Sequence, residues 1–139
     1  IFEDPRVILG IGTDFVNIER IRKVLDRFGD RFEKRVFSDL EIQRSRRKYD
    51  SSSSYAKRWA AKEACSKALG IGLRMGISWK EMQIVNLKSG KPELVIEGKA
   101  KDWLIAMTPN GYSPEINVSL TDDFPWAQAT VIIEAISQS

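Results

Sequence analysis

The sequence predicts an α+β fold in which an antiparallel sheet packs against a long helix. Helical patterns cluster in the first half of the chain, whereas strand-like segments stand at its start and in its second half. Short turns join the later strands in pairs, which favours antiparallel pairing. The chain has 139 residues, of which 42% are hydrophobic and 29% charged, so we expect residues 1–139 to form a single domain.

The chain opens with a strand and an amphipathic helix. Residues 7–13 form an apolar, β-branched run whose glycines would allow another backbone to approach closely, and Asp14 stands at its end. Apolar side chains recur at steps of three and four over residues 18–28, which is typical of a helix with one buried face. Gly29 is the expected stop of this helix.

Two further helices are expected before the middle of the chain. Ser38 and Glu41 have capping-box spacing, which predicts a short helix up to about Arg47. The serines at 51–54 suggest a flexible loop whose last member caps the next helix. Residues 55–69 are the strongest helical segment, and it ends at Gly70.

The second half predicts two strand pairs with a helix between them. The expected pairs are residues 82–87 with 93–97, and residues 115–121 with 126–133. A glycine in the first connection and the Asp-Asp-Phe-Pro sequence of the second mark turns. The helix between the pairs should run from about Lys99 to Ala106.

The composition excludes several classes of chemistry. The chain contains no histidine, which rules out Ser-His-Asp and Cys-His catalysis and histidine metal sites. Cys65 is the single cysteine, so neither an intrachain disulfide nor a CxxC site can form. There is no apolar stretch long enough for a membrane span and no secretory pattern at the start. We therefore expect a cytoplasmic protein without membrane association.

Positive charge is concentrated in one segment. The net charge is only +3, yet residues 20–48 contain eleven lysines and arginines against five acidic residues, a local net charge of +6. Such a segment is either a docking surface for an acidic partner or a solvated helix face. A nucleic-acid-binding module is an alternative of a different class, although aromatic interleaving and a known binding motif are missing from the sequence.

Two carboxylates have unusual neighbours. Asp14 follows a glycine-rich strand, and Glu63 shares a helix face with Trp59 and Lys67, four residues away on either side. A purely structural explanation is equally simple, because Asp14 could cap the next helix and Glu63 could pair with Lys67 on the helix surface. Spacing alone favours the structural explanation, because such pairs are common on solvated helices.

Three ordered motifs resemble the holo-acyl-carrier-protein synthase family of phosphopantetheinyl transferases. They are Gly-Ile-Gly-Thr-Asp at 10–14, the segment from Lys57 to Gly70, and Ser-Gly-Lys-Pro at 89–92. The similarity extends from about Val7 to the end of the chain. The family usually has phenylalanine where Trp59 stands, a conservative aromatic exchange.

This resemblance implies that the protein transfers the 4'-phosphopantetheine arm of coenzyme A to a serine of apo-acyl carrier protein, releasing adenosine 3',5'-bisphosphate. It implies a Mg²⁺ cofactor held by Asp14 and Glu63, an oxygen-ligand set that suits this ion. Lys67 would stabilise or protonate the leaving phosphate. Without histidine, either Glu63 or a metal-bound water would deprotonate the serine.

The resemblance also suggests residues that bind coenzyme A. The expected set is Arg58, Lys62, Lys67, Gly70, Gly72, Lys91 and Pro92. Simpler explanations stay open for several of them, because Arg58 and Lys62 could be solvated cations, Gly70 a helix stop, and Lys91 with Pro92 only a turn.

Acyl carrier proteins are acidic, so the resemblance gives the basic segment a partner. We expect carrier-protein binding by Arg20, Lys23, Arg27 and Arg31, on a helix distinct from that of Glu63. The family also implies a homotrimer with active sites between subunits, and a role in fatty acid biosynthesis.

One residue departs from the family pattern. Asn117 stands where the family commonly carries histidine, so a titratable ring is missing there. A catalytically inactive relative that serves as an assembly subunit is therefore a further alternative, against which the retained Asp14, Glu63 and Lys67 argue.

Overall fold

The computed structural model describes residues 5–71 and 76–139. The strands are β1 (Arg6–Asn17), β2 (Met82–Asn86), β3 (Pro92–Ile96), β4 (Tyr112–Asp123) and β5 (Trp126–Ser137). The helices are α1 (Ile18–Phe28), α2 (Asp30–Val36), α3 (Asp39–Arg46), α4 (Ser51–Leu69) and α5 (Gly98–Met107), with a 3₁₀ turn η1 (Trp79–Glu81). The predicted α+β class is confirmed.

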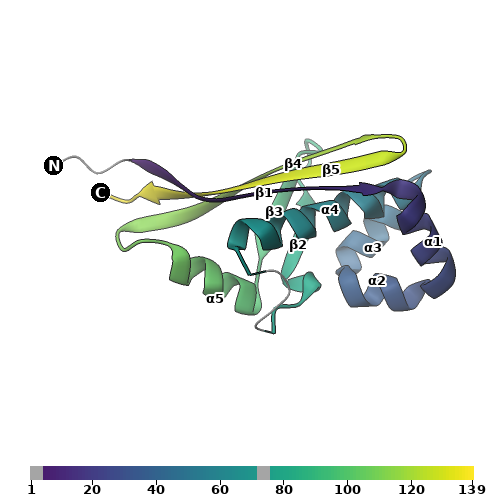
Figure 1. The fold of residues 1–139 in the computed structure, drawn as a ribbon, viewed down its shortest axis with the longest axis horizontal. Coiled ribbons are helices and arrows are strands. Elements are labelled where there is room, and N and C mark those ends of the chain that lie inside the picture. The colour runs from purple at the N-terminus through teal and green to yellow at the C-terminus, as the bar shows by residue number, and fades with distance from the viewer. Residues whose placement is uncertain (1–4, 72–75) are drawn as a thin grey trace.

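The long strands form an antiparallel sheet in the order β1-β5-β4, and α4 lies along one of its faces (Figure 1). Strand β1 is longer than predicted, because its pairing with β5 continues to Asn17 opposite Trp126. Asp14 therefore lies within the strand instead of at its end. It shares the α4-facing side of β1 with Gly12 and Val16, since side chains alternate along a strand.

Small residues let α4 approach the sheet closely. Alanines of the helix and of β5 are almost fully buried at this interface; they include Ala56, Ala60, Ala64, Ala127 and Ala129. On β1, a Cβ atom added at Gly12 would lie 1.9 Å from the carbonyl oxygen of Ala64. Glycine is therefore required at this position, and the predicted close backbone approach is confirmed.

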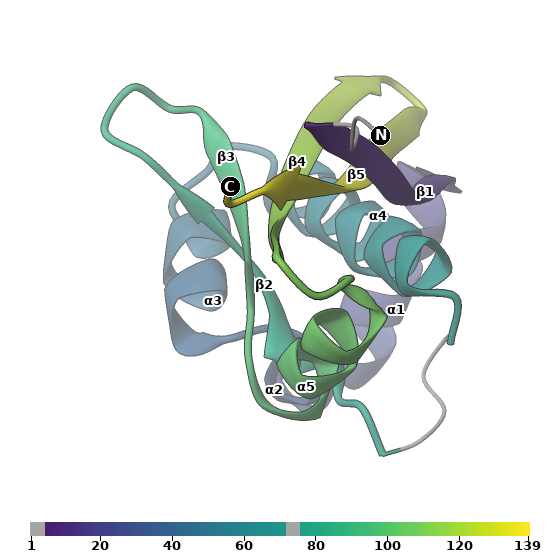
Figure 2. The same ribbon diagram turned by 90° about the vertical axis from the view of Figure 1, so that its left-hand side faces the viewer.

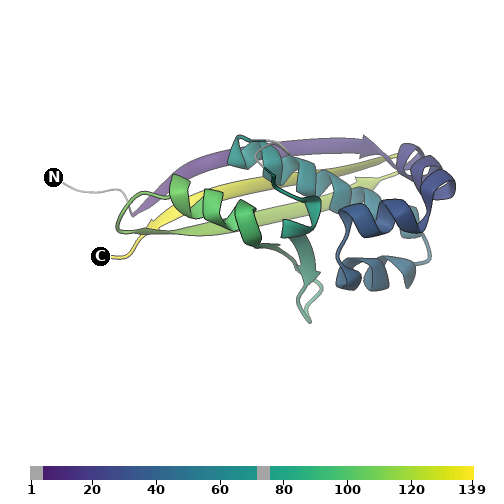
Figure 3. The same cartoon turned by 90° about the horizontal axis from the view of Figure 1, so that it is seen from below.

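The three short helices gather at one end of α4 (Figure 3). Helix α1 ends at Gly29 as predicted, with φ of 51° at that residue, and α3 begins with the predicted capping box of Ser38 and Glu41. Helix α2 was not predicted. The helix has only seven residues, and its buried side chains are Glu33 and Val36. Because one of these is acidic, the segment lacks the apolar pattern from which a helix is predicted.

The serine segment is a correction to the sequence analysis. Residues 51–54 form the first turn of α4, and Asp50 caps the helix by accepting a hydrogen bond from the backbone N–H of Ser53. Ser54 lies 2.9 Å from Ser45 of α3 between their hydroxyl oxygens. The serines therefore form the ordered start of a helix and not the expected flexible loop. The helix ends at Gly70, as predicted.

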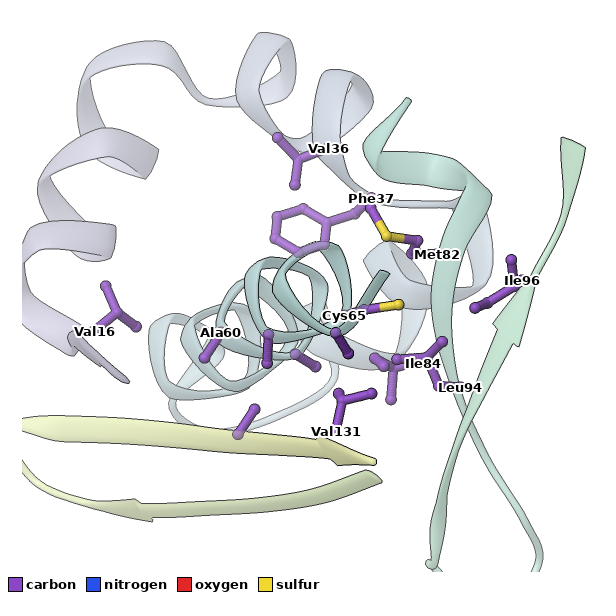
Figure 4. Packing of buried hydrophobic residues seen from close by; sticks show 14 of the residues in the cluster. Val16, Val36, Phe37, Ala60, Cys65, Met82, Ile84, Leu94, Ile96 and Val131 are labelled. Atoms are coloured by element: carbon purple, nitrogen blue, oxygen red, sulfur yellow. The ribbon is translucent and has the colours of Figure 1, made fainter. Parts of the chain in front are cut away.

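The β2–β3 hairpin forms a separate sheet that projects from one side of the body, with α3 beside it (Figure 2). Its apolar side chains pack against α4: Figure 4 shows Met82 and Ile84 of β2 close to Cys65. Helix α5 follows the hairpin and leads into β4. In the part of the chain that the structure describes, no helix has the length and apolar character needed to cross a bilayer.

Candidate functional site

The contact between β1 and α4 brings Asp14 and Lys67 together. The Lys67 ammonium donates to Asp14 Oδ1 at 3.0 Å and to the carbonyl oxygen of Thr13 at 3.1 Å. Gly12 packs against the backbone of Ala64 and Ala68, the residues that directly follow Glu63 and Lys67. The glycine-rich strand thus determines how closely Asp14 approaches the functional side chains of the helix.

Glu63 belongs to the same cluster electrostatically. Partial burial raises the pKa of its carboxyl group, and the negative charge of Asp14 raises it further. The charges of Lys67 and Arg20 act in the opposite direction. Asp14 of β1 therefore acts electrostatically on Glu63 and contacts Lys67, both on α4.

The structure excludes both purely structural explanations of these carboxylates. Asn17, not Asp14, caps α1, because its side chain accepts from the backbone N–H of Glu19. The ion-pair partner of Lys67 is Asp14 on the neighbouring strand instead of Glu63 on its own helix.

The donor set suits a small, hard cation. Repulsion between Asp14 and Glu63 would be relieved by a cation between them, and the Lys67 ammonium already contacts Asp14 from one side. Among the described residues, no group of three or more histidine, cysteine or acidic side chains could hold a metal. Two carboxylates, completed by waters and substrate phosphate, are the usual protein contribution to a Mg²⁺ site.

A basic cavity lies on the other side of α4. It has a volume of about 330 Å³ and lies between α3, α4 and strand β2. Four cations line it: Arg44, Arg47, Lys48 and Arg58. Arg44 Nε is buried without a hydrogen-bond partner among the described residues, so a donor stands ready for an anionic ligand.

The first three of these cations were not predicted as site residues. They belong to the basic run that the sequence analysis identified, and their clustering with Arg58 depends on how α3 packs on α4. The high density of basic residues in segment 20–48 was the only signal in the sequence. Arg58 itself is 5% exposed and is therefore not the solvated cation of the simpler explanation.

Lys62 is a correction to the expected coenzyme A set. Its side chain is fully buried, and its ammonium donates to Glu41 Oε1, the carbonyl oxygen of Met82 and that of Trp79. All three donor hydrogens are used by these bonds. Lys62 is thus neither a solvated cation nor able to reach a ligand from this position.

The remaining expected coenzyme A residues lie in two loops. Gly70 has φ of 79° and ends α4, so its helix-stop role is established, and Gly72 lies outside the described residues. Lys91 is exposed in the β2–β3 turn, and Pro92 begins β3. This turn directly follows strand β2, and residues of β2 line the basic cavity.

The basic residues expected to bind carrier protein divide between two helices. Arg20, Lys23 and Arg27 are exposed on α1, whereas Arg31 is exposed on α2 beyond the break at Gly29. The expectation of one continuous helix was wrong. Arg20 is also not independent of the carboxylate cluster, since its charge acts on the pKa of Glu63.

Asn117 lies on the opposite face of the sheet from α4. Its side-chain amide donates to Glu134 Oε1 at 3.1 Å. Within one chain the sheet therefore separates Asn117 from Asp14 and Glu63, because α4-facing and outward-facing side chains alternate along β4.

The chain is similar to known proteins over most of its length. The sequence profile of the 4'-phosphopantetheinyl transferase superfamily matches residues 10–128. Two similar relatives are the holo-[acyl-carrier-protein] synthases of Roseobacter denitrificans and Ruegeria sp. strain TM1040, both 62% identical. The first alignment covers 94% of this chain and 97% of the relative, and the second covers 93% and 91%.

Solved structures of holo-[acyl-carrier-protein] synthases have the same fold as this chain. The enzyme from Neisseria meningitidis has a TM-score of 0.80 at 32% identity, covering 91% of this chain and 98% of that one. The enzyme from Helicobacter pylori, solved in complex with coenzyme A, has a TM-score of 0.76 at 32% identity, covering 88% and 98%. The chain therefore belongs to the holo-[acyl-carrier-protein] synthase family of the 4'-phosphopantetheinyl transferase superfamily.

Proposed function

We propose that this protein transfers the 4'-phosphopantetheine arm of coenzyme A to a serine hydroxyl of apo-acyl carrier protein and releases adenosine 3',5'-bisphosphate. The observation that carries the proposal is the cluster of Asp14, Glu63 and Lys67 at the contact of β1 with α4. Family membership favours this enzymatic role over nucleic-acid binding and over an inactive assembly subunit.

Asp14 and Glu63 would hold the Mg²⁺ ion of this reaction. When bound, the ion neutralises the diphosphate of coenzyme A and favours the departure of the leaving phosphate. The nearby charge of Asp14 supports this assignment, since it adds to burial in raising the pKa of the Glu63 carboxyl group, and a cation held by both carboxylates would offset this repulsion.

Lys67 would act on the leaving phosphate. Its side chain is half exposed and anchored at Thr13 and Asp14, so the ammonium is held at the edge of the site. A fixed ammonium stabilises negative charge as it builds up on the departing oxygen and can supply its proton. Glu63, whose pKa is raised by burial, would accept the serine proton.

Coenzyme A would use the basic cavity for its phosphates. Arg58 lines it together with Arg44, Arg47 and Lys48, and the orphan Arg44 Nε supplies an additional donor. Arginine forks bind phosphate oxygens through paired hydrogen bonds. Lys91 and Pro92, on the adjoining hairpin, would complete the rim, while Lys62 stays outside the ligand contacts.

The two halves of this site face different directions within one chain. Arg58 and Glu63 are five residues apart on α4, so their side chains point about 140° apart around the helix. Arg58 contacts β2 and Lys67 contacts β1, and Figure 2 shows these strands on different sides of α4. A ligand that touches both halves would therefore bridge two copies of the chain.

A homotrimer with active sites between subunits would provide this arrangement. The sheet face opposite α4 is free of helices among the described residues (Figure 1), and large hydrophobic side chains are exposed on β1 and β5. They include Ile8, Ile11, Phe15 and Trp126, of which Ile11 is 64% and Phe15 67% exposed. Such a patch is typical of a subunit interface.

Mixing of inactive variants tests the shared site. Lys67→Ala and Arg58→Ala chains, each nearly inactive alone, should regain activity when they are unfolded, mixed and refolded into one assembly. One interface then contains Lys67 from one subunit and Arg58 from another. A mixture that stays inactive although mixed assemblies form would contradict a site between subunits.

The proposed partner is an acidic acyl carrier protein, and the proposed setting is cytoplasmic fatty acid biosynthesis. Exposed cations on α1 and α2 support the partner, since ion pairs to Lys23, Arg27 or Arg31 are missing among the described residues. Charge complementarity of this kind mainly accelerates association.

The transfer itself is tested by mass spectrometry of the carrier protein. Apo-acyl carrier protein is incubated with the chain, coenzyme A and Mg²⁺, and we expect the mass of one phosphopantetheine to be added. A chelator should prevent the gain, and so should replacement of the acceptor serine by alanine. An unchanged carrier mass in the complete reaction would contradict the proposed function.

A further inference from the structure

Along the edge of strand β2 that does not face β3, backbone groups form hydrogen bonds with charged side chains instead of with another strand. In an antiparallel pair, residues alternate between those that exchange both backbone hydrogen bonds with the partner strand and those that exchange none. Ile84 lies opposite Leu94 and is of the second kind, because its N–H and C=O both bond to side chains on the α3 and α4 side.

Three ionic side chains occupy the place that a neighbouring strand would take. Glu41 Oε2 accepts from the backbone N–H of Ile84 at 3.1 Å, and Arg58 Nη1 donates to the carbonyl oxygen of the same residue at 2.6 Å. Lys62 donates to the carbonyl oxygen of Met82 at 2.6 Å. These three side chains, Glu41, Arg58 and Lys62, are called the edge clamp below.

Glu41 is the member that joins the clamp together. Its Oε1 accepts from Lys62 at 2.8 Å and from the backbone N–H of Ser38 at 3.0 Å, while Arg58 Nη1 lies 3.7 Å from Oε2. The carboxylate is fully buried. It is the shared counter-charge of two buried cations, and it connects the start of α3, the middle of α4 and strand β2.

The clamp forms part of the wall of the basic cavity. Arg58 and the β2 residues Ile84 and Asn86 all line this cavity, and Arg58 Nη2 also donates to Asn86 Oδ1 at 2.9 Å. Burial lowers the pKa of Arg58 and of Lys62, whereas the charge of Glu41 opposes this in both. The carboxylate thus compensates the buried charge of the cavity arginine and orients its side chain.

We infer that Glu41 is a positioning residue of the coenzyme A site, which fixes Arg58 and the β2 wall of the basic cavity without touching the ligand. The inference deepens the proposed function and rests on its placement of coenzyme A in this cavity. A capping box explains Glu41 locally, but capping needs only one of its oxygens and does not require a link to β2.

The test compares Glu41→Gln with Glu93→Gln, an exposed carboxylate on the same hairpin. Glutamine has one acceptor oxygen and two N–H donors, so it cannot serve Ile84 and Lys62 together. We expect the Kd for coenzyme A, measured by calorimetry, to rise about tenfold in Glu41→Gln, as for loss of a charge-assisted contact. The turnover rate at saturating coenzyme A should change less than about twofold.

Hydrogen exchange gives a readout that needs no ligand. The amide of Ile84 should exchange at least about tenfold faster in Glu41→Gln. The backbone N–H of Val85, the next residue, points toward β3 instead of toward Glu41, so this amide should keep its protection. Equal acceleration of both amides, together with an unchanged Kd, would overturn the inference and leave Glu41 with only a general stabilising role.

A second variant covers the case in which Glu41→Gln fails to fold. The double variant Glu41→Met with Lys62→Met removes the buried Glu41–Lys62 ion pair as a unit and leaves Arg58 in place, and folded proteins often tolerate replacement of a whole buried pair by apolar side chains. It should also show weaker coenzyme A binding and an unprotected Ile84 amide, and a wild-type Kd in it would overturn the inference. If the wild-type chain itself did not bind coenzyme A, the proposed function would fail, an outcome distinct from normal binding in the variants.

Discussion

Replacing Gly12 by alanine should slow the transfer because it displaces the candidate site, and not only because it lowers the stability of the fold. The new Cβ atom would lie 1.9 Å from the carbonyl oxygen of Ala64 and 2.9 Å from the amide nitrogen of Ala68. Since real Cβ contacts essentially never fall below 3.0 Å, β1 and α4 must separate by about 1.1 Å at this point. Both contacts are backbone atoms, so side-chain rotation cannot relieve them.

The separation acts directly on the candidate site. Asp14 lies two residues beyond Gly12 on the same face of β1, and its contact with Lys67 Nζ is 3.0 Å. An increase of about 1 Å would break this hydrogen bond and widen the gap between Asp14 and Glu63. Misplacement of this size can cost about 10²-fold in rate, whereas the overpacking itself costs about 1–3 kcal/mol.

The assay is single-turnover transfer to apo-acyl carrier protein, with urea unfolding measured in parallel. Gly111→Ala is the matched control, because Gly111 has φ of 84° with open space around it and lies at the opposite end of the sheet. Alanine there should cost about 1–2 kcal/mol without slowing transfer. A Gly12→Ala chain that transfers at the wild-type rate would refute the idea that this glycine determines the spacing of the site.

Four further outcomes follow from the described contacts. Lys67→Ala should lower the turnover rate about 10²–10³-fold and change the KM for coenzyme A much less, and a pure rise in KM would make Lys67 a binding residue. Arg27→Glu should slow carrier-protein association at low salt and approach wild type at high salt in surface plasmon resonance, whereas Lys101→Glu on α5 should not. Asn117→His should fold normally, and an increase in activity would show that this chain forgoes a contribution of the histidine that the family resemblance leads us to expect at this position. The pKa of Glu33 is lowered mainly because Arg46 donates to its carboxylate, so its stabilisation is present above about pH 4.5 and is lost as pH falls. Glu33→Gln should therefore lower the free energy of unfolding by about 1–3 kcal/mol at pH 7 and by much less near pH 3, and a difference that does not vary with pH would contradict this.

Local signals predicted most of the secondary structure. The capping box at Ser38, the glycine stops at Gly29 and Gly70 and the hairpin at 88–92 each depend on a few neighbouring residues, and each is confirmed. The serine segment failed because low complexity suggested a loop, whereas Asp50 supplies a cap just before it.

The candidate site was only partly accessible from the sequence. Asp14, Glu63 and Lys67 were identified by motif resemblance, and the contact of β1 with α4 explains why they meet. Lys62 was assigned to the ligand from the family resemblance, and only the packing of α3 and β2 shows that it is buried.

The tertiary role of Glu41 had no separate signal in the sequence. The capping box accounts for an acid at this position, so nothing local points to the link with β2 that its second oxygen makes. The basic cavity could likewise not be predicted from neighbouring residues, because Arg44 and Arg58 come together only through the packing of α3 and α4.

The Mg²⁺ dependence of the initial transfer rate tests the central claim most directly. It is measured for the wild-type chain, for Glu63→Gln and for Asp102→Asn, an exposed carboxylate on α5 that serves as the control. If Asp14 and Glu63 hold the metal, Glu63→Gln should lose about 10²–10³-fold in rate at low Mg²⁺ and recover part of it as Mg²⁺ is raised, while Asp102→Asn follows the wild-type curve. A Glu63→Gln chain that is folded by circular dichroism and keeps the wild-type rate at low Mg²⁺ would contradict the account.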